Sequence, residues 1–135
     1  MRLTHTTLDG VEVTVKIKGS ETGKKSGLHI LARGIIDDTF PLASVIEEAE
    51  IKLFSAYSNP IFFDFFIPVS RLFIEVQGQQ HYTYSSFFHK NKRAFHKHLM
   101  RDRNKKEWCE LNDYRLLELR YDEKDQWETQ ILSMK

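Results

Sequence analysis

Alternation of apolar and charged side chains marks the first regular element of the chain. The segment Val11-Glu-Val-Thr-Val-Lys-Ile-Lys18 has the two-residue period of a half-exposed strand. Leu8-Asp9-Gly10 supplies a turn before it. A loop over residues 19–27 and a second strand over residues 28–36 are expected to follow. The pattern therefore predicts that residues 1–40 form an N-terminal β-hairpin extension.

Helical spacing appears next. Ser44 and Glu47 are placed as in a capping box, in which the two residues bond each other's backbone N–H groups. The apolar residues that follow recur three or four positions apart, namely Ile46, Ala49, Leu53 and Tyr57. Ser58-Asn59-Pro60 would end the element. The spacing predicts a helix over residues 44–57.

The remaining pattern predicts two strands, a long helix, a strand and a short helix. The strands near residues 61–67 and 71–77 flank a turn at Pro68-Val69-Ser70. The long helix would run from about residue 87 to residue 111, and the last strand over residues 115–121. The short helix would be anchored by Trp127 and Ile131. The chain is expected to be an α/β (α+β) protein and one compact domain, with a core over residues 41–135.

Composition excludes several classes. No apolar run approaches the roughly 20 residues of a membrane-spanning helix, and the N-terminus lacks a signal-peptide pattern. The single Cys109 rules out an internal disulfide and makes a cysteine-based zinc site improbable. We therefore expect no membrane partner and a cytoplasmic location, in a bacterium or a phage-infected host.

Charge is distributed unevenly along the chain. The 20 Lys and Arg residues nearly balance 19 Asp and Glu residues, yet residues 90–106 contain a single acid. The basic residues of this segment are Lys90, Lys92, Arg93, Lys97, Arg101, Arg103, Lys105 and Lys106. Such a stripe on an otherwise acidic protein favours a polyanion as partner. A solvated helix surface is the alternative interpretation.

Two carboxylates interrupt the apolar strands. Asp64 lies within Phe62-Phe63-Asp64-Phe65-Phe66, and Glu75 lies within the second strand. An isolated charge inside an apolar strand is costly unless it is neutralised. Two carboxylates that converge across a hairpin can share a divalent cation, and Mg²⁺ prefers such oxygen ligands. The backbone carbonyl of Val76 would be a third ligand, and an ion pair of Asp64 with Lys or Arg is the alternative.

These residues resemble a known family. The pattern Asp-X10-Glu-X-Gln, followed by Gly-X-X-His-Tyr and later by Asp-X-X-Lys-X-X-Trp-Cys, is similar to the PD-(D/E)XK restriction-endonuclease-like superfamily. The nearest branch contains very short patch repair endonucleases and phage EDxHD homing endonucleases. The resemblance covers residues 44–122 and implies a mixed central sheet flanked by helices, with the site at one edge of the sheet.

The resemblance implies roles for individual residues. Asp64 matches the metal-binding aspartate and Glu75 the second acid, while Gln77 stands where the superfamily usually has lysine. His81 matches a catalytic histidine suited to proton transfer. A hydrogen-bonded turn histidine is the alternative for His81.

Further roles fall on the basic helix and on the helix predicted over residues 44–57. Asp102 matches an acid that orients His81 or binds metal through water, although an ion pair with a neighbouring cation would also explain it. Lys105 could replace the missing strand lysine near the scissile phosphate. The acid of the earlier helix is Glu50 or Glu47, with Glu50 slightly favoured.

The resulting hypothesis is a magnesium-dependent DNA endonuclease, a hydrolase that nicks or cuts DNA, with Mn²⁺ as a substitute metal. DNA would be contacted by basic residues of the long helix, namely Lys90, Lys92, Arg93, Lys97, Arg101, Arg103 and Lys106. The alternatives are a catalytically weak or inactive nuclease-fold binding protein, and a structure-selective resolvase of the Holliday-junction type acting as a homodimer. The recognition sequence and the role of residues 1–40 stay open.

Overall fold

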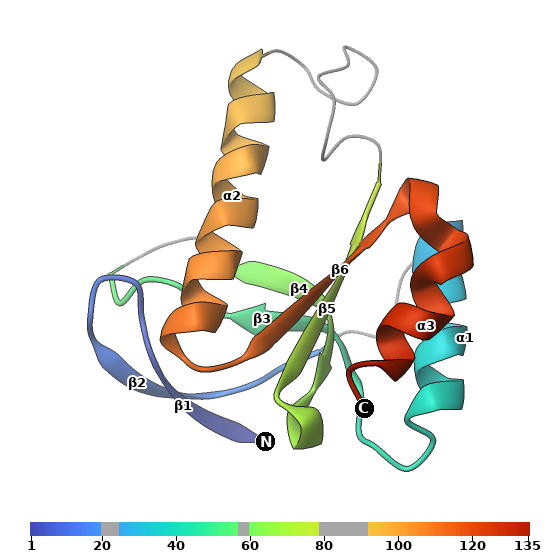
Figure 1. Cartoon of the computed structure of the whole chain (residues 1–135). Coiled ribbons are helices and arrows are strands. Elements are labelled where there is room, and N and C mark those ends of the chain that lie inside the picture. Colours follow the sequence, from blue (N-terminus) through green and yellow to red (C-terminus); the bar gives the residue numbers. More distant parts are fainter. Residues whose placement is uncertain (20–24, 57–59, 79–91) are drawn as a thin grey trace.

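The computed structural model describes residues 1–19, 25–56, 60–78 and 92–135. Its strands are β1 (Arg2–Thr6), β2 (Glu12–Lys16), β3 (Ile46–Ile51), β4 (Ile61–Ile67), β5 (Leu72–Gln77) and β6 (Arg115–Arg120). Its α-helices are α1 (Gly27–Thr39), α2 (Lys92–Leu111) and α3 (Trp127–Leu132), and shorter 3₁₀ turns span Pro68–Ser70 and Tyr121–Gln126. The protein is thus of the mixed α+β class (Figure 1).

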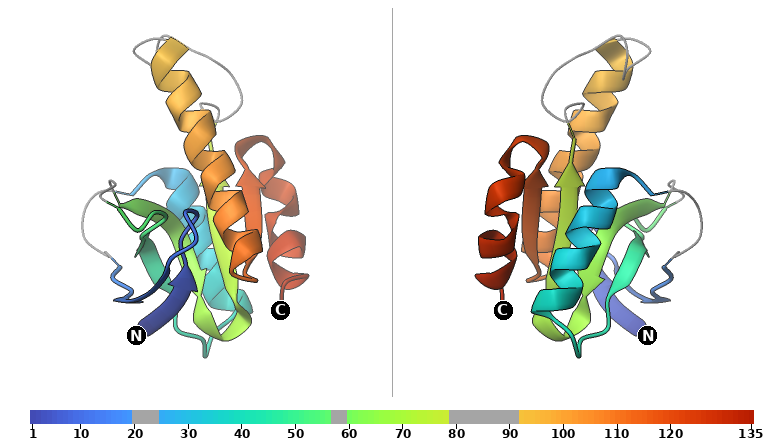
Figure 2. Two further views of the ribbon diagram at one scale, coloured as in Figure 1. Left: turned by 90° about the vertical axis from the view of Figure 1, so that its left-hand side faces the viewer. Right: turned by 90° about the vertical axis from the view of Figure 1, so that its right-hand side faces the viewer.

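A four-stranded mixed sheet forms the centre of the molecule. Its strand order is β3-β4-β5-β6, with antiparallel pairing from β3 to β5 and parallel pairing between β5 and β6. Parallel neighbours need a crossover connection, and α2 lies within it. Figure 2 shows α2 and the β1-β2 hairpin on one face of the sheet, with α1 and α3 on the other.

Each face of the sheet has its own hydrophobic core. The α1-side cluster joins α1 and α3 to the sheet and contains Ala32, Ile36, Phe40, Phe65, Ile67, Leu72, Ile74, Leu117, Leu119, Trp127 and Ile131. The α2-side cluster joins the hairpin and the C-terminal end of α2 to the sheet and contains Leu3, Ile17, Ala49, Ile51, Leu53, Phe63, Phe66, Phe73, Trp108 and Cys109. The sheet is therefore covered on both faces.

The predicted strand over residues 28–36 is wrong, because this segment belongs to helix α1. His29, Ala32 and Ile36 are buried at steps of three and four residues, which place them on one helical face. Ser26 caps the helix, since its hydroxyl accepts the backbone N–H of His29 at 3.2 Å. The apolar run is long enough to suggest a strand, yet its buried positions follow the helical period.

The predicted helix over residues 44–57 is also wrong, because residues 46–51 form strand β3. Ile46 and Ala49 both pack in the α2-side cluster, although residues three apart in a regular strand point to opposite faces. Glu48 lies between them with a φ of 49°, so the strand twists locally and the inward side changes parity. The resulting three-residue spacing imitates a helix.

The other predicted elements are confirmed where the structure describes them. Strands β4, β5 and β6 and helix α3 match their predicted ranges, and α2 is described from residue 92 onward. The strand predicted over residues 11–18 is present as β2, but it pairs with β1, which the sequence pattern did not predict, and not with residues 28–36. Asn112 contacts this hairpin by accepting the Thr6 N–H at 2.7 Å. The domain boundary at residue 40 stays a prediction. No helix among the described residues is long and apolar enough to cross a membrane.

Candidate active site

The carboxylates of Asp64 and Glu75 lie where strands β4 and β5 separate. The ladder between these strands pairs Ile67 with Leu72 and ends at the pair of Phe65 and Ile74. The next position in this register would place Asp64 opposite Glu75. There the Asp64 carboxylate accepts the backbone N–H of Val76 at 2.8 Å, in place of a strand-to-strand backbone bond. We call this position the fork, and it brings the two acids together as the sequence predicted.

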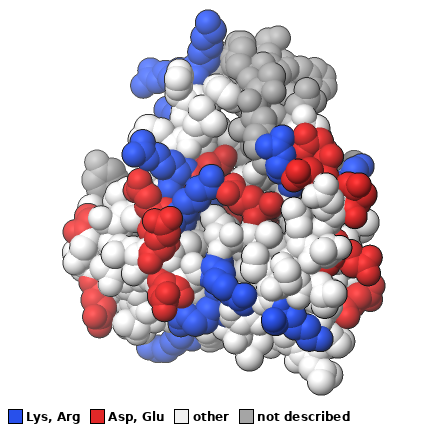
Figure 3. Space-filling view, in the orientation of Figure 1, with Lys and Arg blue, Asp and Glu red and all other residues white. Residues whose placement is uncertain are grey.

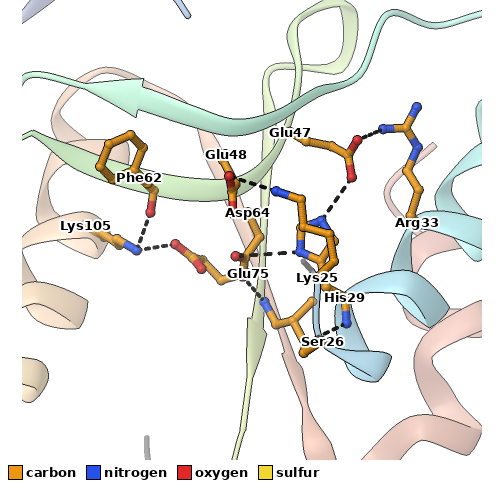
Figure 4. Close-up of polar contacts among 11 residues, drawn as sticks. Lys25, Ser26, His29, Arg33, Glu47, Glu48, Phe62, Asp64, Glu75 and Lys105 are labelled. Atoms are coloured by element: carbon orange, nitrogen blue, oxygen red, sulfur yellow. Dashed lines mark hydrogen bonds and ion pairs between the residues drawn. The ribbon is translucent and has the colours of Figure 1, made fainter. Parts of the chain in front are cut away.

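Glu75 is a buried acid with one cationic partner. It is 7% exposed, and its carboxylate contacts the Lys105 ammonium of helix α2 (Figure 4). Burial raises the pKa of Glu75 well above its ordinary value, and the charge of Asp64 and a hydrogen bond with it act in the same direction. The nearby Lys105 opposes this shift. Burial and the neighbouring Asp64 therefore outweigh Lys105 in setting the pKa of Glu75.

Lys105 is held at the fork by a second contact. Its Nζ donates to the backbone carbonyl of Phe62 in strand β4 at 2.7 Å. This bond and the contact with Glu75 tie α2 to both strands of the fork (Figure 4). Residues 64, 75 and 105, which are distant in sequence, thus meet in space, while their chemical roles stay predictions.

A second set of polar groups reaches the fork from helix α1. His29 Nε2 lies 2.9 Å from Glu47 Oε1, and Arg33 Nη1 lies 2.6 Å from Glu47 Oε2. The other ring nitrogen of His29, Nδ1, is 4.0 Å from Asp64 Oδ1. Glu47 projects from strand β3 and not from the helical cap assigned to it by the sequence pattern, so its predicted capping role is wrong.

Gln77 and Asp102 line a separate cavity of about 480 Å³ beside the fork. The amide of Gln77 donates to the carboxylate of Glu118 on β6, and Glu118 Oε1 also lies 3.1 Å from Lys106 Nζ. Asp102 Oδ2 is 3.8 Å from His98 Nε2, one helical turn away. The amide that stands in the usual lysine position is thus engaged with a neighbouring acid.

Glu50 lies away from the fork contacts. It lines a cavity of about 320 Å³ together with Lys16, Lys18 and Lys52. Strand β3 separates the two candidate helix acids, because Glu47 faces α1 whereas Glu50 faces the lysines of this cavity. The contact with His29 therefore favours Glu47 as the acid nearer to Asp64.

The predicted DNA-contacting residues that the structure describes are exposed on α2. They are Lys92, Arg93, Lys97, Arg101, Arg103 and Lys106. Figure 3 shows basic side chains at the upper end of the molecule, where α2 rises above the sheet, and mixed charges lower down. His81 and Lys90 lie outside the described residues.

The fork offers oxygen ligands for part of the coordination shell of Mg²⁺. The described residues contain no group of three or more His, Cys, Asp or Glu side chains placed to hold a metal ion. Mg²⁺, however, is commonly held by one or two carboxylates, with waters and substrate phosphate filling the other positions. Asp64 and Glu75 supply such a pair of carboxyl groups at the fork.

The sequence pattern did not identify His29, Arg33 or Glu118 as members of the site. The apolar run over residues 28–36 predicts a strand, and a strand there gives no reason to join His29 or Arg33 to the site. The spacing of His29, Ala32 and Ile36 was the available signal for a helix that buries a histidine. Glu118 gave no comparable signal, since a lone acid in a strand is common at a solvated edge.

Comparisons with known proteins find two viral relatives over about half of the chain. A 62-residue segment is 40% identical to "Uncharacterized protein 307L" of Invertebrate iridescent virus 6 and covers 46% of this chain. A 63-residue segment is 38% identical to "Uncharacterized protein 033L" of Invertebrate iridescent virus 3 and covers 47% of this chain. Each match spans 32% of the viral protein, so the chain spans about a third of the length of these relatives. No family model and no solved structure matches the chain.

Proposed function

We propose that this protein is a magnesium-dependent DNA endonuclease built on a restriction-endonuclease-like core. The observation that carries the proposal is the meeting of Asp64, Glu75 and Lys105 at the fork. A phosphodiester cutter needs acids that hold a cation and a base or cation close to the phosphate. The mixed sheet with helices on both faces supports the proposed core.

Each residue of the fork has a defined task in this proposal. Asp64 and Glu75, with the Val76 carbonyl, would hold Mg²⁺, which supplies Lewis-acid polarisation of the phosphate and a more acidic bound water. Lys105 would neutralise the phosphate, since its ammonium already contacts Glu75 and the Phe62 carbonyl at the fork. The positive charge of Lys105 would replace that of the lysine usually found at the position of Gln77.

The exposed cations of α2 would bind the DNA backbone. Apart from Lys105, the Lys and Arg residues of this helix are exposed along its length, namely Lys92, Arg93, Lys97, Arg101, Arg103 and Lys106. Contacts of this kind position a duplex and make its affinity dependent on salt. The proposal therefore assigns binding to α2 and bond cleavage to the fork beneath it.

Cleavage of supercoiled plasmid tests the proposal. Wild-type protein with Mg²⁺ or Mn²⁺ should convert the plasmid to nicked or linear product, and EDTA should stop the reaction. Asp64→Asn should lower the cleavage rate by about 100-fold or more because it removes the charge of a metal ligand, while a gel shift without metal stays unchanged. Asp38→Asn, which removes an exposed acid from α1, is the matched control.

Two results would contradict the proposal. Cleavage by Asp64→Asn at the wild-type rate would exclude the fork as the active site. Cleavage that persists in EDTA would exclude the metal.

A DNA-binding protein with a nuclease-like fold is the second candidate. It is favoured by the engagement of Gln77 with Glu118 and of Lys105 with Glu75, because neither side chain is then free to act on a phosphate without rearranging. In the plasmid assay this candidate predicts no product and a salt-sensitive gel shift. Four-way junctions in the same assay separate a dimeric resolvase from an enzyme that acts on duplex DNA.

A further inference from the structure

Helix α1 reaches the fork through one buried side chain. The His29 side chain is 8% exposed, and its ring stacks on Phe65 with centroids 4.4 Å apart and planes inclined by 28°. Phe65 belongs to strand β4 and is the residue directly after Asp64. The ring is thus fixed against the same strand that carries the candidate metal ligand.

The orientation of the His29 ring is set from the side away from Asp64. Nε2 lies 2.9 Å from Glu47 Oε1, and the second oxygen of Glu47 lies 2.6 Å from Arg33. A histidine bonded through one nitrogen to a carboxylate presents its other nitrogen in a fixed direction. Here that nitrogen, Nδ1, faces Asp64 Oδ1 at 4.0 Å.

We propose that His29 is a positioning residue for Asp64, held by Glu47 and Arg33, and that helix α1 thereby takes part in the candidate active site. The inference rests on the proposed function. Asp64 Oδ2 accepts the Val76 N–H at 2.8 Å, and His29 Nδ1 lies 4.0 Å from Oδ1. One oxygen is thus held by a hydrogen bond and the other faces a buried ring of fixed orientation, so the carboxylate has less freedom to lose when a cation arrives, which lowers the entropic cost of binding it.

A purely structural role for His29 is the competing explanation. In that case its ring would only fill space between α1 and Phe65, and replacement would change stability without changing the affinity of the fork for metal. The two explanations differ because positioning acts through the nitrogens, whereas filling space acts through the ring. A variant that keeps a ring and removes the nitrogens separates them.

The test measures Mn²⁺ binding to the DNA-free protein by electron paramagnetic resonance, together with plasmid cleavage. His29→Phe keeps an aromatic ring on Phe65 and removes both nitrogens, and His29→Ala removes the ring as well. We expect both variants to weaken Mn²⁺ affinity and to lower cleavage by about 10- to 100-fold, the usual effect of losing an outer partner of a metal ligand. Asp38→Asn should match wild type in both measurements.

Each outcome has a defined meaning. Unchanged Mn²⁺ affinity in a folded His29→Phe protein would overturn the positioning role, even if its melting temperature falls. Should His29→Ala fail to fold, His29→Phe and Glu47→Gln decide, and the latter should weaken Mn²⁺ affinity in the same direction. A wild-type protein that neither binds Mn²⁺ nor cleaves DNA would instead refute the proposed function itself.

Discussion

The two helices that flank the fork are anchored in different ways. Helix α1 buries His29, Ala32, Ile36 and Thr39 along its 13 residues, so its whole length lies against the sheet. Helix α2 has 20 residues, and its buried residues are Trp108 and Cys109 near its C-terminal end. Burial along a full helix fixes side chains in place, whereas anchoring at one end leaves exposed surface for a partner.

The same difference appears in the polar side chains that the helices bring to the fork. α1 contributes His29 and Arg33, which are both engaged with Glu47 behind the strand. α2 contributes Lys105 to Glu75 and carries its other cations outward. Helix α1 thus contacts Glu47 and lies beside Asp64, while α2 pairs with Glu75 and carries its other cations into solvent.

The largest expected effect comes from removing the anchor of α2. Trp108 is fully buried, packs on Phe63 and Phe73, and donates its indole N–H to His5 Nδ1 at 3.2 Å. Trp108→Ala should lower the free energy of unfolding by about 3–5 kcal/mol, as is typical for a large buried aromatic residue. Urea denaturation followed by circular dichroism measures this loss.

The exposed Leu99 on the same helix supplies the control for this prediction. Leu99→Ala should change the free energy of unfolding by less than about 1 kcal/mol, since its side chain is already partly in solvent. Equal losses in the two variants would show that α2 is anchored along its length and would remove the contrast with α1.

A smaller effect is expected at the fork. Glu75→Gln should raise the free energy of unfolding at neutral pH by roughly 1 kcal/mol. Gains of this size are common when a site residue that destabilises the fold is replaced. The reason is that burial and the charge of Asp64 raise the pKa of Glu75 despite Lys105, so its ionised form destabilises the folded state. Urea denaturation at pH 7 measures the difference.

The stability difference between Glu75→Gln and the wild type should depend on pH. Folded Glu75 binds its proton more tightly than unfolded Glu75, so the wild type gains stability relative to Glu75→Gln as the pH falls through the raised pKa. The advantage of Glu75→Gln should therefore shrink toward acidic pH. An advantage that grows on acidification would mean that Lys105 outweighs burial.

The outward cations of α2 should affect binding and leave stability nearly unchanged. The double variant Lys97→Gln/Arg101→Gln should change the free energy of unfolding by less than about 0.5 kcal/mol, because both residues are exposed. The slope of log affinity for DNA against log salt should fall by about two, one for each lost phosphate contact. Fluorescence anisotropy at several salt concentrations measures the slope.

Lys124→Gln, at an exposed position between β6 and α3, is the matched control for the loss of charge. For each positive charge removed, Lys124→Gln should change the slope of log affinity against log salt less than the α2 variant does. An equal change per charge would show that net charge, and not the α2 surface, governs DNA binding.

The smallest expected signal is at Cys109. Its thiol is 2% exposed, and burial raises its pKa to about 12, so little reactive thiolate forms at neutral pH. We expect iodoacetamide to leave native protein unmodified in mass spectrometry while alkylating it in urea. Rapid alkylation of the native protein would show that the C-terminal end of α2 detaches readily from the sheet.

The sequence predicted the α2 side of the fork better than the α1 side. Asp64 and Glu75 stand out because a charge within an apolar strand breaks a strong pattern, and Lys105 follows from a motif one helix later. His29 lacks such contrast, because a histidine in an apolar run fits either a strand or a helix. The sequence predicts a helix at its partner Glu47, because the apolar residues around Glu47 recur three or four positions apart.

The incorrect prediction over residues 44–57 has its physical cause at one residue. A strand with regular alternation would have shown Ile46 and Ala49 on opposite faces, and the two-residue period would have been visible. The positive φ of Glu48 cannot be deduced from the identity of a glutamate, because residues with a Cβ rarely adopt it. Local spacing therefore indicated the wrong element where the backbone departs from regularity.

In β3 the side chains that face the α2-side cluster change from even to odd positions at Glu48, and β4 shows the same kind of change at Asp64. This shared irregularity constrains how the fold can be re-engineered. Phe63 and Phe66 both pack in the α2-side cluster, as do their partners Ala49 and Ile46, so the two strands shift together around Glu48 and Asp64. A regular β4 would place Phe63 and Phe66 on opposite faces, so the irregularity at Asp64 keeps both in the α2-side cluster. A designer who wishes to transplant the site must move residues 46–67 as one unit, since Asp64 alone would not keep its direction in a regular strand.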